Sequence, residues 1–307
     1  MMDIIAVCGE AIVDLVPTGV GTYAALPGGS PANTAVALAR LGVPTRLLAR
    51  LSDDASGRLL RSHLLTNGVD LSRAVAATEP SSVALVDVAA DGSAAYRFLM
   101  DGTADWQWTD TELTELGPDV VAVHAGSLAL ARVPALELFL ARATCTVSLD
   151  PNLRPALLGD LHETRAAMDR WLALADVVKA SSDDVQLLEP GADPLEVALR
   201  WSARGPALVV VTLAGDGALA VLRGDPEPVR RPAVPVTVVD TVAAGDTFTA
   251  GLLTRLLGAG RLGGRLDGLT RGEVEQALDL GLRAAAVTCS RAGAEPPWAE
   301  ELAVPAR

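Results

Sequence analysis

The fold of this chain is constrained most by a regular alternation of short apolar segments with longer segments of helical periodicity. Apolar runs typical of buried strands occupy residues 4–8, 119–123, 145–149, 177–179, 208–212 and 218–222. Helical spacing marks residues 32–41, 55–65, 133–142, 161–174, 195–204, 246–257 and 274–288. Strands that alternate with helices form parallel sheets with helical crossovers. The pattern therefore predicts an α/β sandwich of three layers, with a mostly parallel central sheet covered on both faces.

Two stretches, residues 13–27 and 82–108, interrupt this alternation. The second contains SVALVDVAADGSAAYRFLM, in which two runs of strand character flank Asp91-Gly92. Asp-Gly between such runs is a strong signal for a β-hairpin. A hairpin inside an α/β chain predicts a small separate sheet, which is either a lid over a site or a plain surface hairpin. Trp106 and Trp108, at its end, are either core residues or part of a dimer contact.

Composition excludes several classes of protein. Hydrophobic residues make up 50% of the 307 residues and charged residues 21%, which excludes a disordered chain. A net charge of −13 disfavours nonspecific binding to nucleic acid or to an anionic membrane. No apolar run reaches the roughly 18 residues of a membrane span, and the first residues lack the basic region of a signal peptide. Three cysteines cannot all pair internally, so we expect a reduced, cytoplasmic protein.

Familiar nucleotide and zinc motifs are absent or out of context. Residues 19–24 fit the dinucleotide pattern G-x-G-x-x-A, but Pro17 precedes them and Pro27-Gly28-Gly29 follows where a helix would have to run. The chain has no Walker-type phosphate loop, and its three histidines are scattered. We therefore expect neither a Rossmann nucleotide site nor a zinc site.

The segment PGGSPANTA, residues 27–35, joins two glycines to the start of a predicted helix. Gly28 and Gly29 allow the backbone to come close to a ligand, and Asn33 lies in the first helical turn. Free amides and a carboxamide suit hydrogen bonds to hydroxyl groups. The alternative is an ordinary glycine turn in which Ser30 caps the helix, and these residues alone leave both interpretations open.

The segment DTVAAGDTFTAG, residues 240–251, leads through small residues into a helix predicted to start near Asp246. The amides of Ala244, Gly245 and Asp246 and the helix dipole would form an anion site. Asp246 is then either a helix cap or a base that faces a bound phosphate across a hydroxyl group. A proton acceptor beside donors for the transferred group is the minimum for phosphoryl transfer.

Together these two segments resemble the paired signatures of the ribokinase-type (phosphofructokinase B type) carbohydrate kinases. The first signature is Gly-Gly-x-x-x-Asn, from Gly28 to Asn33, and the second is Asp-Thr-x-x-Ala-Gly-Asp, from Asp240 to Asp246. Further matching segments span the chain: Gly9-Glu10 with Asp14, DPNLRP at 150–155, KASSDD at 179–184, TLAGDG at 212–217 and SRAGA at 290–294. Within the family, GEAIVDLVP, PGGSPANTAVALARLG, GTADWQW and SLDPNLRP are most similar to the bacterial fructokinase branch.

The resemblance implies a role for each matched residue. Asp246 resembles the catalytic base, and Ala243, Ala244 and Gly245 resemble the anion hole. Asp14, Gly28, Gly29 and Asn33 resemble the sugar-binding set, and Arg97 and Arg154 look like further substrate contacts, although Arg97 alone could be a solvated hairpin residue. The implied nucleotide-binding residues are Lys179, Ser181, Thr212, Gly215 and Gly217. Asp184 is implied to contact Mg²⁺ through water.

The resemblance also implies an activity. We expect a ribokinase-like fold whose core comprises residues 1–12, 28–81 and 109–307 and whose β lid comprises residues 13–27 and 82–108. The implied reaction is ATP- and Mg²⁺-dependent phosphorylation of a primary hydroxyl, with D-fructose to fructose 6-phosphate as the first expectation. Alternatives are a 2-keto-3-deoxygluconate kinase, a ribokinase or nucleoside kinase, and a noncatalytic sugar-binding protein on a kinase fold. A K⁺ requirement and a homodimer through the lid stay open, and we expect no nucleic acid or membrane partner.

Some positions depart from the family pattern. Ser181 and Asp184 stand where the family usually has Asn-x-x-Glu, Ala243 replaces the first glycine of the anion hole, and Ala214 replaces a glycine in the nucleotide loop. Many relatives place an asparagine near the adenine in the late helix, whereas here that helix has none. The choice of ATP over GTP is therefore an assumption.

Overall fold

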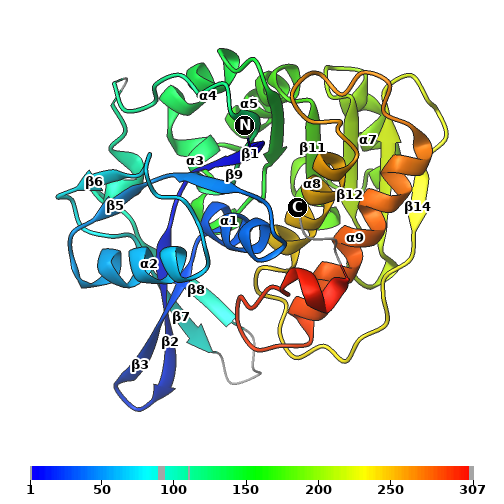
Figure 1. Ribbon diagram of the computed structural model, residues 1–307. Helices are drawn as coiled ribbons and strands as arrows, with labels where there is room; N and C mark the ends of the chain where they lie inside the picture. Colours follow the sequence, from blue (N-terminus) through cyan, green and yellow to red (C-terminus); the bar gives the residue numbers. More distant parts are fainter. Residues whose placement is uncertain (1, 89–93, 110, 304–307) are drawn as a thin grey trace.

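The structure is a computed structural model that describes residues 2–88, 94–109 and 111–303. Its described residues form a central sheet of eight strands in the order β14-β13-β12-β11-β10-β9-β1-β4 (Figure 1). These strands are β1 (Ile4–Cys8), β4 (Thr45–Leu48), β9 (Val120–Gly126), β10 (Thr146–Asp150), β11 (Val177–Ser181), β12 (Leu208–Thr212), β13 (Ala218–Leu222) and β14 (Val229–Arg231). The pairs from β4 to β12 are parallel, and β13 and β14 add an antiparallel edge. The predicted mostly parallel sheet is confirmed.

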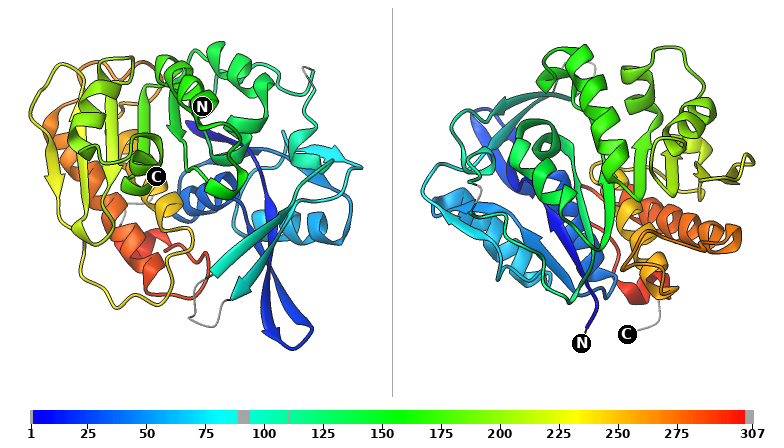
Figure 2. Two further views of the ribbon diagram at one scale, coloured as in Figure 1. Left: turned by 180° about the vertical axis from the view of Figure 1, so that it is seen from behind. Right: turned by 90° about the horizontal axis from the view of Figure 1, so that it is seen from above.

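Helices cover both faces of this sheet (Figure 2). They are α1 (Ser30–Arg40), α2 (Ala55–Thr66), α3 (Ser127–Arg132), α4 (Pro134–Ala141), α5 (Leu161–Leu174), α6 (Ser182–Leu188), α7 (Pro194–Ser202), α8 (Ala244–Gly258) and α9 (Arg271–Cys289). Helices α1, α8 and α9 pack on one face, and α3 to α7 pack on the other. The two helical layers and the sheet between them give the predicted three-layer sandwich.

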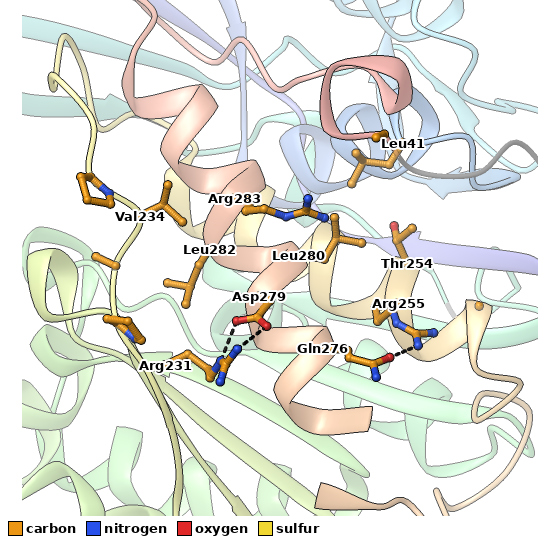
Figure 3. Close-up of a pocket in the computed structure, with 15 residues that line it drawn as sticks. Leu41, Arg231, Val234, Thr254, Arg255, Gln276, Asp279, Leu280, Leu282 and Arg283 are labelled. Atoms are coloured by element: carbon orange, nitrogen blue, oxygen red, sulfur yellow. Dashed lines mark hydrogen bonds and ion pairs between the residues drawn. The ribbon is translucent and has the colours of Figure 1, made fainter. Parts of the chain in front are cut away.

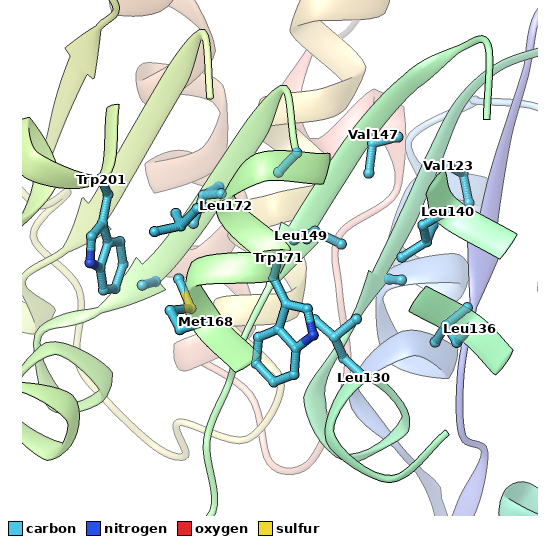
Figure 4. Close-up of a cluster of buried hydrophobic side chains, with 14 of the residues drawn as sticks. Val123, Leu130, Leu136, Leu140, Val147, Leu149, Met168, Trp171, Leu172 and Trp201 are labelled. Carbon is cyan, nitrogen blue, oxygen red and sulfur yellow. The ribbon is translucent and has the colours of Figure 1, made fainter. Parts of the chain in front are cut away.

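Alternate residues of the strands supply the two halves of the core, because successive side chains of a strand point to opposite faces. On one face, Val147 and Leu149 of β10 pack with Trp171 and Leu172 of α5 in a large buried cluster (Figure 4). On the other face, Val177 and Val210 pack with Phe248 of α8, and Leu278 of α9. Strands that are buried on both faces are apolar along their whole length, and this is why the sequence predicts a sheet covered by helices on both sides.

A second sheet of four strands lies beside the core, in the order β3-β2-β7-β8 among the described residues. Its strands are β2 (Ile12–Gly19), β3 (Thr22–Gly28), β7 (Val83–Val88) and β8 (Ala94–Leu99), and β2 and β3 extend away from the helices in Figure 1. Strands β7 and β8 pair antiparallel, as the hairpin signal predicts, although Asp91-Gly92 lies outside the described residues. Residues 19–24 form the β2–β3 turn and not the start of a helix, so they are no dinucleotide site.

Buried polar residues fix the place where the chain crosses between the two sheets. Asp105, in the short helix η1 (Ala104–Trp106), accepts a hydrogen bond of 3.0 Å from the amide of Ala11, just before β2. Glu10, next to Ala11, accepts one of 3.1 Å from the amide of Ala129. Both carboxylates are almost fully buried. The crossing is thereby joined both to the segment that follows β8 and to α3.

Some elements differ from the sequence-based expectation. Strands β4, β5 (Arg50–Ser52) and β6 (Val75–Ala77) and helices α3 and α6 were not predicted, because each is too short to show a clear period. Trp106 and Trp108 are half-buried and pack against the large buried cluster. The described residues include no helix long and apolar enough to cross a membrane. All three cysteines are free.

Candidate active site

The predicted site residues gather where the parallel strands of the central sheet end. Lys179 and Asp150 lie near the carboxyl ends of β11 and β10, and helix α8 points its first turn at the same edge. In open α/β sheets this edge is where ligands bind, because loops and helix starts converge there. The topology therefore brings together residues from the middle and the end of the chain.

The loop that precedes α8 fixes the conformation at the start of this helix. Ala243 adopts a left-handed conformation, with φ 59°, and no side chain caps the helix. Asp240 fixes the loop by accepting hydrogen bonds from the amides of Val242, at 3.1 Å, and Gly293, at 2.8 Å. The amide of Ala244 donates to the carbonyl of Thr241 at 3.2 Å, so this predicted anion-hole donor is already paired. The first-turn amide of Gly245 has no such partner within the described part of the chain.

Asp246 lies in the first turn of α8, three positions after the cap, and its side chain is 6% exposed. It is therefore not the helix cap. Its Oδ1 accepts a hydrogen bond of 2.6 Å from the Ser30 hydroxyl, and its Oδ2 accepts one of 3.0 Å from the Asn33 carboxamide. Both donors come from α1, which packs against α8. The turn at Gly28 and Gly29 thus places the start of α1 against the Asp246 carboxylate. Ser30 is not the cap of α1, because Gly29 occupies the cap position.

A buried ion pair lies under the same helix start. Nζ of Lys179 is 2.9 Å from Oδ2 of Asp150, and both side chains are at most 4% exposed. A Cβ atom built on Gly245 would lie 2.9 Å from that Nζ, so the ammonium group reaches the first turn of α8. Only glycine fits there without moving the lysine.

The charges around Lys179 explain why it stays protonated. Burial alone would lower the pKa of Lys179, but the carboxylates of Asp150, Asp184 and Asp246 raise it above its usual value. Burial raises the pKa of Asp150 to about 6, against the opposing effect of Lys179. Near neutral pH the site therefore holds one buried cation among three carboxylates, beside the positive end of a helix dipole.

Ser181 and Asp184 form a capping box at the start of α6. Oδ2 of Asp184 accepts hydrogen bonds from the amide and hydroxyl of Ser181, at 2.8 and 2.6 Å, and its Oδ1 accepts one of 2.7 Å from the amide of Leu153. These bonds account for Ser-x-x-Asp at this position, because a capping box satisfies two helix-end donors reciprocally. They use three of the roughly four acceptor positions of this carboxylate, so Oδ1 of Asp184 can still accept a hydrogen bond from one metal-bound water.

The predicted sugar-binding residues occupy the junction between the second sheet and α1. A Cβ atom on Gly28 would lie 2.5 Å from Oδ2 of Asp14, and one on Gly29, with φ 99°, would lie 2.8 Å from the carbonyl oxygen of Glu10. The two glycines therefore make room for Asp14 and for the neighbouring backbone. Burial raises the pKa of Asp14 to about 6, and Arg154 partly opposes this shift.

The two predicted arginines are both exposed. Arg154 donates a hydrogen bond of 2.6 Å to the side chain of Asn152 and interacts electrostatically with Asp14. Arg97 lies on β8, opposite Leu85 of β7, in the second sheet. The structure thus groups Arg154 with Asp14 and places Arg97 on a separate element.

Three of the five predicted nucleotide-binding residues, Thr212, Gly215 and Gly217, line one cavity of about 570 Å³ at the start of α8, whereas Lys179 and Ser181 are not part of its lining. Thr212, Gly215 and Gly217 form one wall with the first turn of α8, where Ala244 and Gly245 also line the cavity. Most of its remaining lining is apolar and comes from α8, α9 and residues 233–238; the apolar side chains include Val236, Val238, Phe248, Leu282, Ala285, Ala286 and Cys289. Thr241 also lines the cavity. This is one continuous pocket with a backbone-rich end at α8 and an apolar end.

A larger hollow of about 1060 Å³ is separate from the predicted residues (Figure 3). It spreads across α9, with Arg231 and Val234 on one side of the helix and Thr254 and Arg255 on the other. The described residues also include no cluster of three or more carboxylate, histidine or cysteine side chains that could hold a metal ion directly.

Sequence reasoning missed two residues of the site. Ser30 was considered only as a helix cap, and Asp150 was quoted within a motif without a role. Asp150 had a signal, since it is an acid at the end of an apolar strand beside a strand that carries the only lysine. The pairing of Ser30 with Asp246 had none, because the two residues are 216 positions apart.

Known proteins that are similar to this chain in sequence and in fold include carbohydrate kinases. A family model described as pfkB family carbohydrate kinase matches residues 2–301. A fructokinase from Rhizobium leguminosarum bv. trifolii is 37% identical over 258 residues, which cover 81% of this chain and 78% of that protein. The crystal structure of a fructokinase from Vibrio cholerae O395, in a form with bound fructose, ADP and calcium ion, superposes with a TM-score of 0.81 at 29% identity, covering 95% of this chain and 94% of that one.

A second kind of kinase is comparably similar in structure. The aminoimidazole riboside kinase from Salmonella enterica, solved with aminoimidazole riboside and an ATP analogue, has a TM-score of 0.82 at 29% identity and covers 98% of this chain and 99% of that one. The family match spans nearly the whole chain and includes the buried aspartate, the helix start and the lysine described above. This chain belongs to the pfkB family of carbohydrate kinases.

Proposed function

We propose that the protein is an ATP-dependent fructokinase that converts D-fructose to fructose 6-phosphate. The observation that carries the proposal is the buried Asp246 in the first turn of α8, with Lys179 and Gly245 beside it. A proton acceptor next to cationic and amide donors is the constellation that phosphoryl transfer to a hydroxyl needs. Fructose is favoured as the acceptor because the curated relatives that this chain resembles include fructokinases from several organisms.

In this proposal the sugar lies at the junction of the second sheet and α1. Asp14 accepts hydrogen bonds from sugar hydroxyls, assisted by Asn33 and the backbone at Gly28 and Gly29, and Arg97 and Arg154 approach the phosphate path. Asp14 is half-buried, and an acceptor that pairs with sugar hydroxyls rejects deoxy analogues, since its oxygens would be left unpaired.

The chemical step uses the start of α8. As the sugar oxygen bonds to the γ-phosphorus of ATP, its proton passes to Asp246, and the bond from γ-phosphorus to the bridging oxygen breaks to release ADP. Lys179 and the Gly245 amide stabilise the charge on the transferred group. Ala243 and Ala244 shape this turn, and the Ala244 amide joins the anion hole only if it leaves Thr241.

ATP is proposed to occupy the 570 Å³ cavity, with its phosphates near Thr212, Gly215 and Gly217 and toward α8. Mg²⁺ fits this arrangement. Oδ1 of Asp150 is buried and has no hydrogen-bond partner among the described residues, and the charge of Asp184 contributes to the raised pKa of Asp150. These two carboxylates would hold the waters of a hydrated Mg²⁺, while Ser181 only fixes Asp184. When bound, the ion neutralises charge on the β- and γ-phosphates.

We propose that the second sheet acts as a lid, comprising residues 13–27 and 82–108, that closes over the sugar and excludes water. Exclusion of water suppresses hydrolysis of ATP in the absence of sugar. We also propose a cytoplasmic location, which the three free cysteines support.

The test is ADP release from the purified protein with MgATP and a panel of acceptors: fructose, 2-keto-3-deoxygluconate, ribose, tagatose and aminoimidazole riboside. We expect turnover with fructose to exceed that with every other acceptor, and chelation of Mg²⁺ to abolish it. Asp246→Asn should lower kcat by about 10²- to 10⁴-fold while fructose still binds. Negligible turnover in both proteins, with sugar binding retained, would instead indicate a noncatalytic sugar-binding protein.

A further inference from the structure

Helix α1 begins in an unusual way for a helix with serine at its first position. Ser30 follows the cap residue Gly29 and precedes a proline, and serine hydroxyls near a helix start often bond to nearby backbone groups. Its hydroxyl instead donates to Asp246, 216 positions along the chain, at 2.6 Å. A hydroxyl that crosses to another helix constrains the group that it reaches.

The two hydrogen bonds from α1 hold different oxygens of one carboxylate. Ser30 holds Oδ1 and the Asn33 carboxamide, at 3.0 Å, holds Oδ2. A carboxylate held at one oxygen can still turn about its Cβ–Cγ bond, whereas one held at both oxygens cannot. Hydrogen bonds to a charged acceptor are short and about twice as strong as neutral ones, so this clamp is stiff.

The clamp is also shielded from solvent. Ser30 is 9% exposed and Asp246 is 6% exposed, so water competes poorly for either oxygen. Each carboxylate oxygen can accept more than one hydrogen bond, so a further lone pair is left for an incoming hydroxyl.

We propose that Ser30 is a positioning residue for the reaction: it holds the Asp246 carboxylate in the plane in which it accepts the proton of the substrate hydroxyl. The inference rests on the proposed function, because it assigns Asp246 the role of base. A base that is misaligned loses rate even when substrates bind normally, since only the transition state requires the alignment.

The experiment compares Ser30→Ala and Ser30→Thr with the wild-type protein. We expect Ser30→Ala to lower kcat by about 10-fold, with KM for the sugar and for MgATP changed by less than about 2-fold. Ser30→Thr keeps the hydroxyl and should restore kcat to within about 3-fold of wild type. An unchanged kcat in Ser30→Ala, or a loss that Ser30→Thr does not repair, would overturn the inference.

The chain offers a matched control one turn further along the same helix. Thr34 is also buried, but its hydroxyl has no hydrogen-bond partner in the part of the chain that the structure describes, so Thr34→Val removes a hydroxyl from α1 without breaking any of the described bonds. We expect its kcat to equal that of wild type. A loss in Thr34→Val as large as in Ser30→Ala would mean that disturbance of α1, and not the bond to Asp246, causes the effect.

The acceptor panel separates failure of this inference from failure of the proposed function. If another sugar proves to be the substrate, the Ser30 variants are measured with that sugar and the expectation is unchanged. If no acceptor turns over, the crystal structure of Ser30→Ala decides. A rotated Asp246 carboxylate supports the positioning role, and a carboxylate in its wild-type position overturns it.

Discussion

At the scale of single residues, the site depends on one cation. Lys179 reaches the first turn of α8 because residue 245 is glycine, and it stays charged because three aspartates surround it. Asp150 contacts it directly, at 2.9 Å. We therefore expect the position and charge of the Lys179 ammonium group to depend on the small size of Gly245 and on the charges of the neighbouring aspartates.

Gly245→Ala tests that dependence. The added Cβ would lie 2.9 Å from Nζ and would move the ammonium group away from Asp150 or from the transferred phosphate. We expect kcat to fall by about 10- to 100-fold, less than the roughly 10²- to 10³-fold that complete loss of one donor to a developing charge costs, because the ammonium group is displaced and not removed. Stability should not fall as much, because alanine is the better helix former. Steady-state kinetics and thermal unfolding measure the two effects.

Gly272→Ala is the matched control, since Gly272 lies in the first turn of α9 and a Cβ there would meet nothing within 4 Å. It should leave kcat unchanged. A Gly245→Ala protein with wild-type kcat would mean that Lys179 does not need its observed position.

Single residues also show what the sequence can predict. Asp246 was predictable because small residues before a helical run are a local signal for a helix start. The capping box of Ser181 and Asp184 is an equally local pattern, but α6 is too short for its spacing to indicate a helix, so the sequence did not predict this cap. The clamp of Ser30 on Asp246 follows from the packing of α1 against α8, which no local pattern encodes.

At the scale of elements, α9 supplies an apolar wall of the cavity proposed for the nucleotide. The residues that it contributes to the 570 Å³ cavity are Leu282, Ala285, Ala286 and Cys289, and none of them carries an amide or a charge. Val236 and Val238 face the same space from the segment before α8. The absence of asparagine in the late helix, noted from sequence, therefore leaves an apolar wall.

From this wall we predict weak discrimination between nucleoside triphosphates. A site that hydrogen-bonds its substrate rejects analogues by 10⁴-fold or more, whereas apolar contact discriminates by roughly 10- to 200-fold at most. We expect kcat/KM for ATP and GTP to differ by less than about 10-fold when both are measured at saturating sugar. A preference for ATP above about 10³-fold would contradict this and would assign base recognition to backbone groups of residues 233–238.

The elements themselves were largely predictable from periodicity. Strands β1, β12 and β13 and helix α5 have the bounds that apolar spacing predicts, because continuous burial leaves a continuous signal. Short elements such as β5 and α3 carry too few residues for a period to emerge. The order of the strands in the sheet depends on contacts between distant segments, so local periodicity could not predict it.

At the scale of the whole molecule, the protein folds around several buried acids. Glu10 is 1% exposed, at the crossing between the two sheets. Burial raises its pKa to about 7, and the nearby Asp105 adds to this shift. Burial also raises the pKa of Asp105 to about 6. Both shifts mean that folding disfavours the charged form of these groups.

These shifts predict how stability depends on pH. A raised pKa in the folded state gives a contribution that is complete below the usual carboxyl pKa and is lost as pH rises through the folded value. For Glu10 the window runs from about pH 4.5 to about pH 7. We expect Glu10→Gln to be more stable than wild type at pH 8, by about 1–3 kcal/mol, and to lose this advantage near pH 4.5. Urea unfolding at the two pH values measures the difference.

Glu115→Gln, which removes a charge from an exposed side chain, is the control and should change stability by less than about 0.5 kcal/mol at both pH values. If Glu10→Gln destabilises the protein equally at pH 4.5 and pH 8, the hydrogen bonds of Glu10 matter more than its buried charge.

The burial of Lys179 has a consequence for chemical labelling. It is the only lysine of the chain and is 3% exposed, so the folded protein offers no side-chain amine to an acylating reagent. A succinimidyl ester should therefore acylate the lysine side chain only when the sheet opens. Mass spectrometry of the intact protein would then count unfolded molecules directly, because each chain that has exposed its interior carries one additional acyl group.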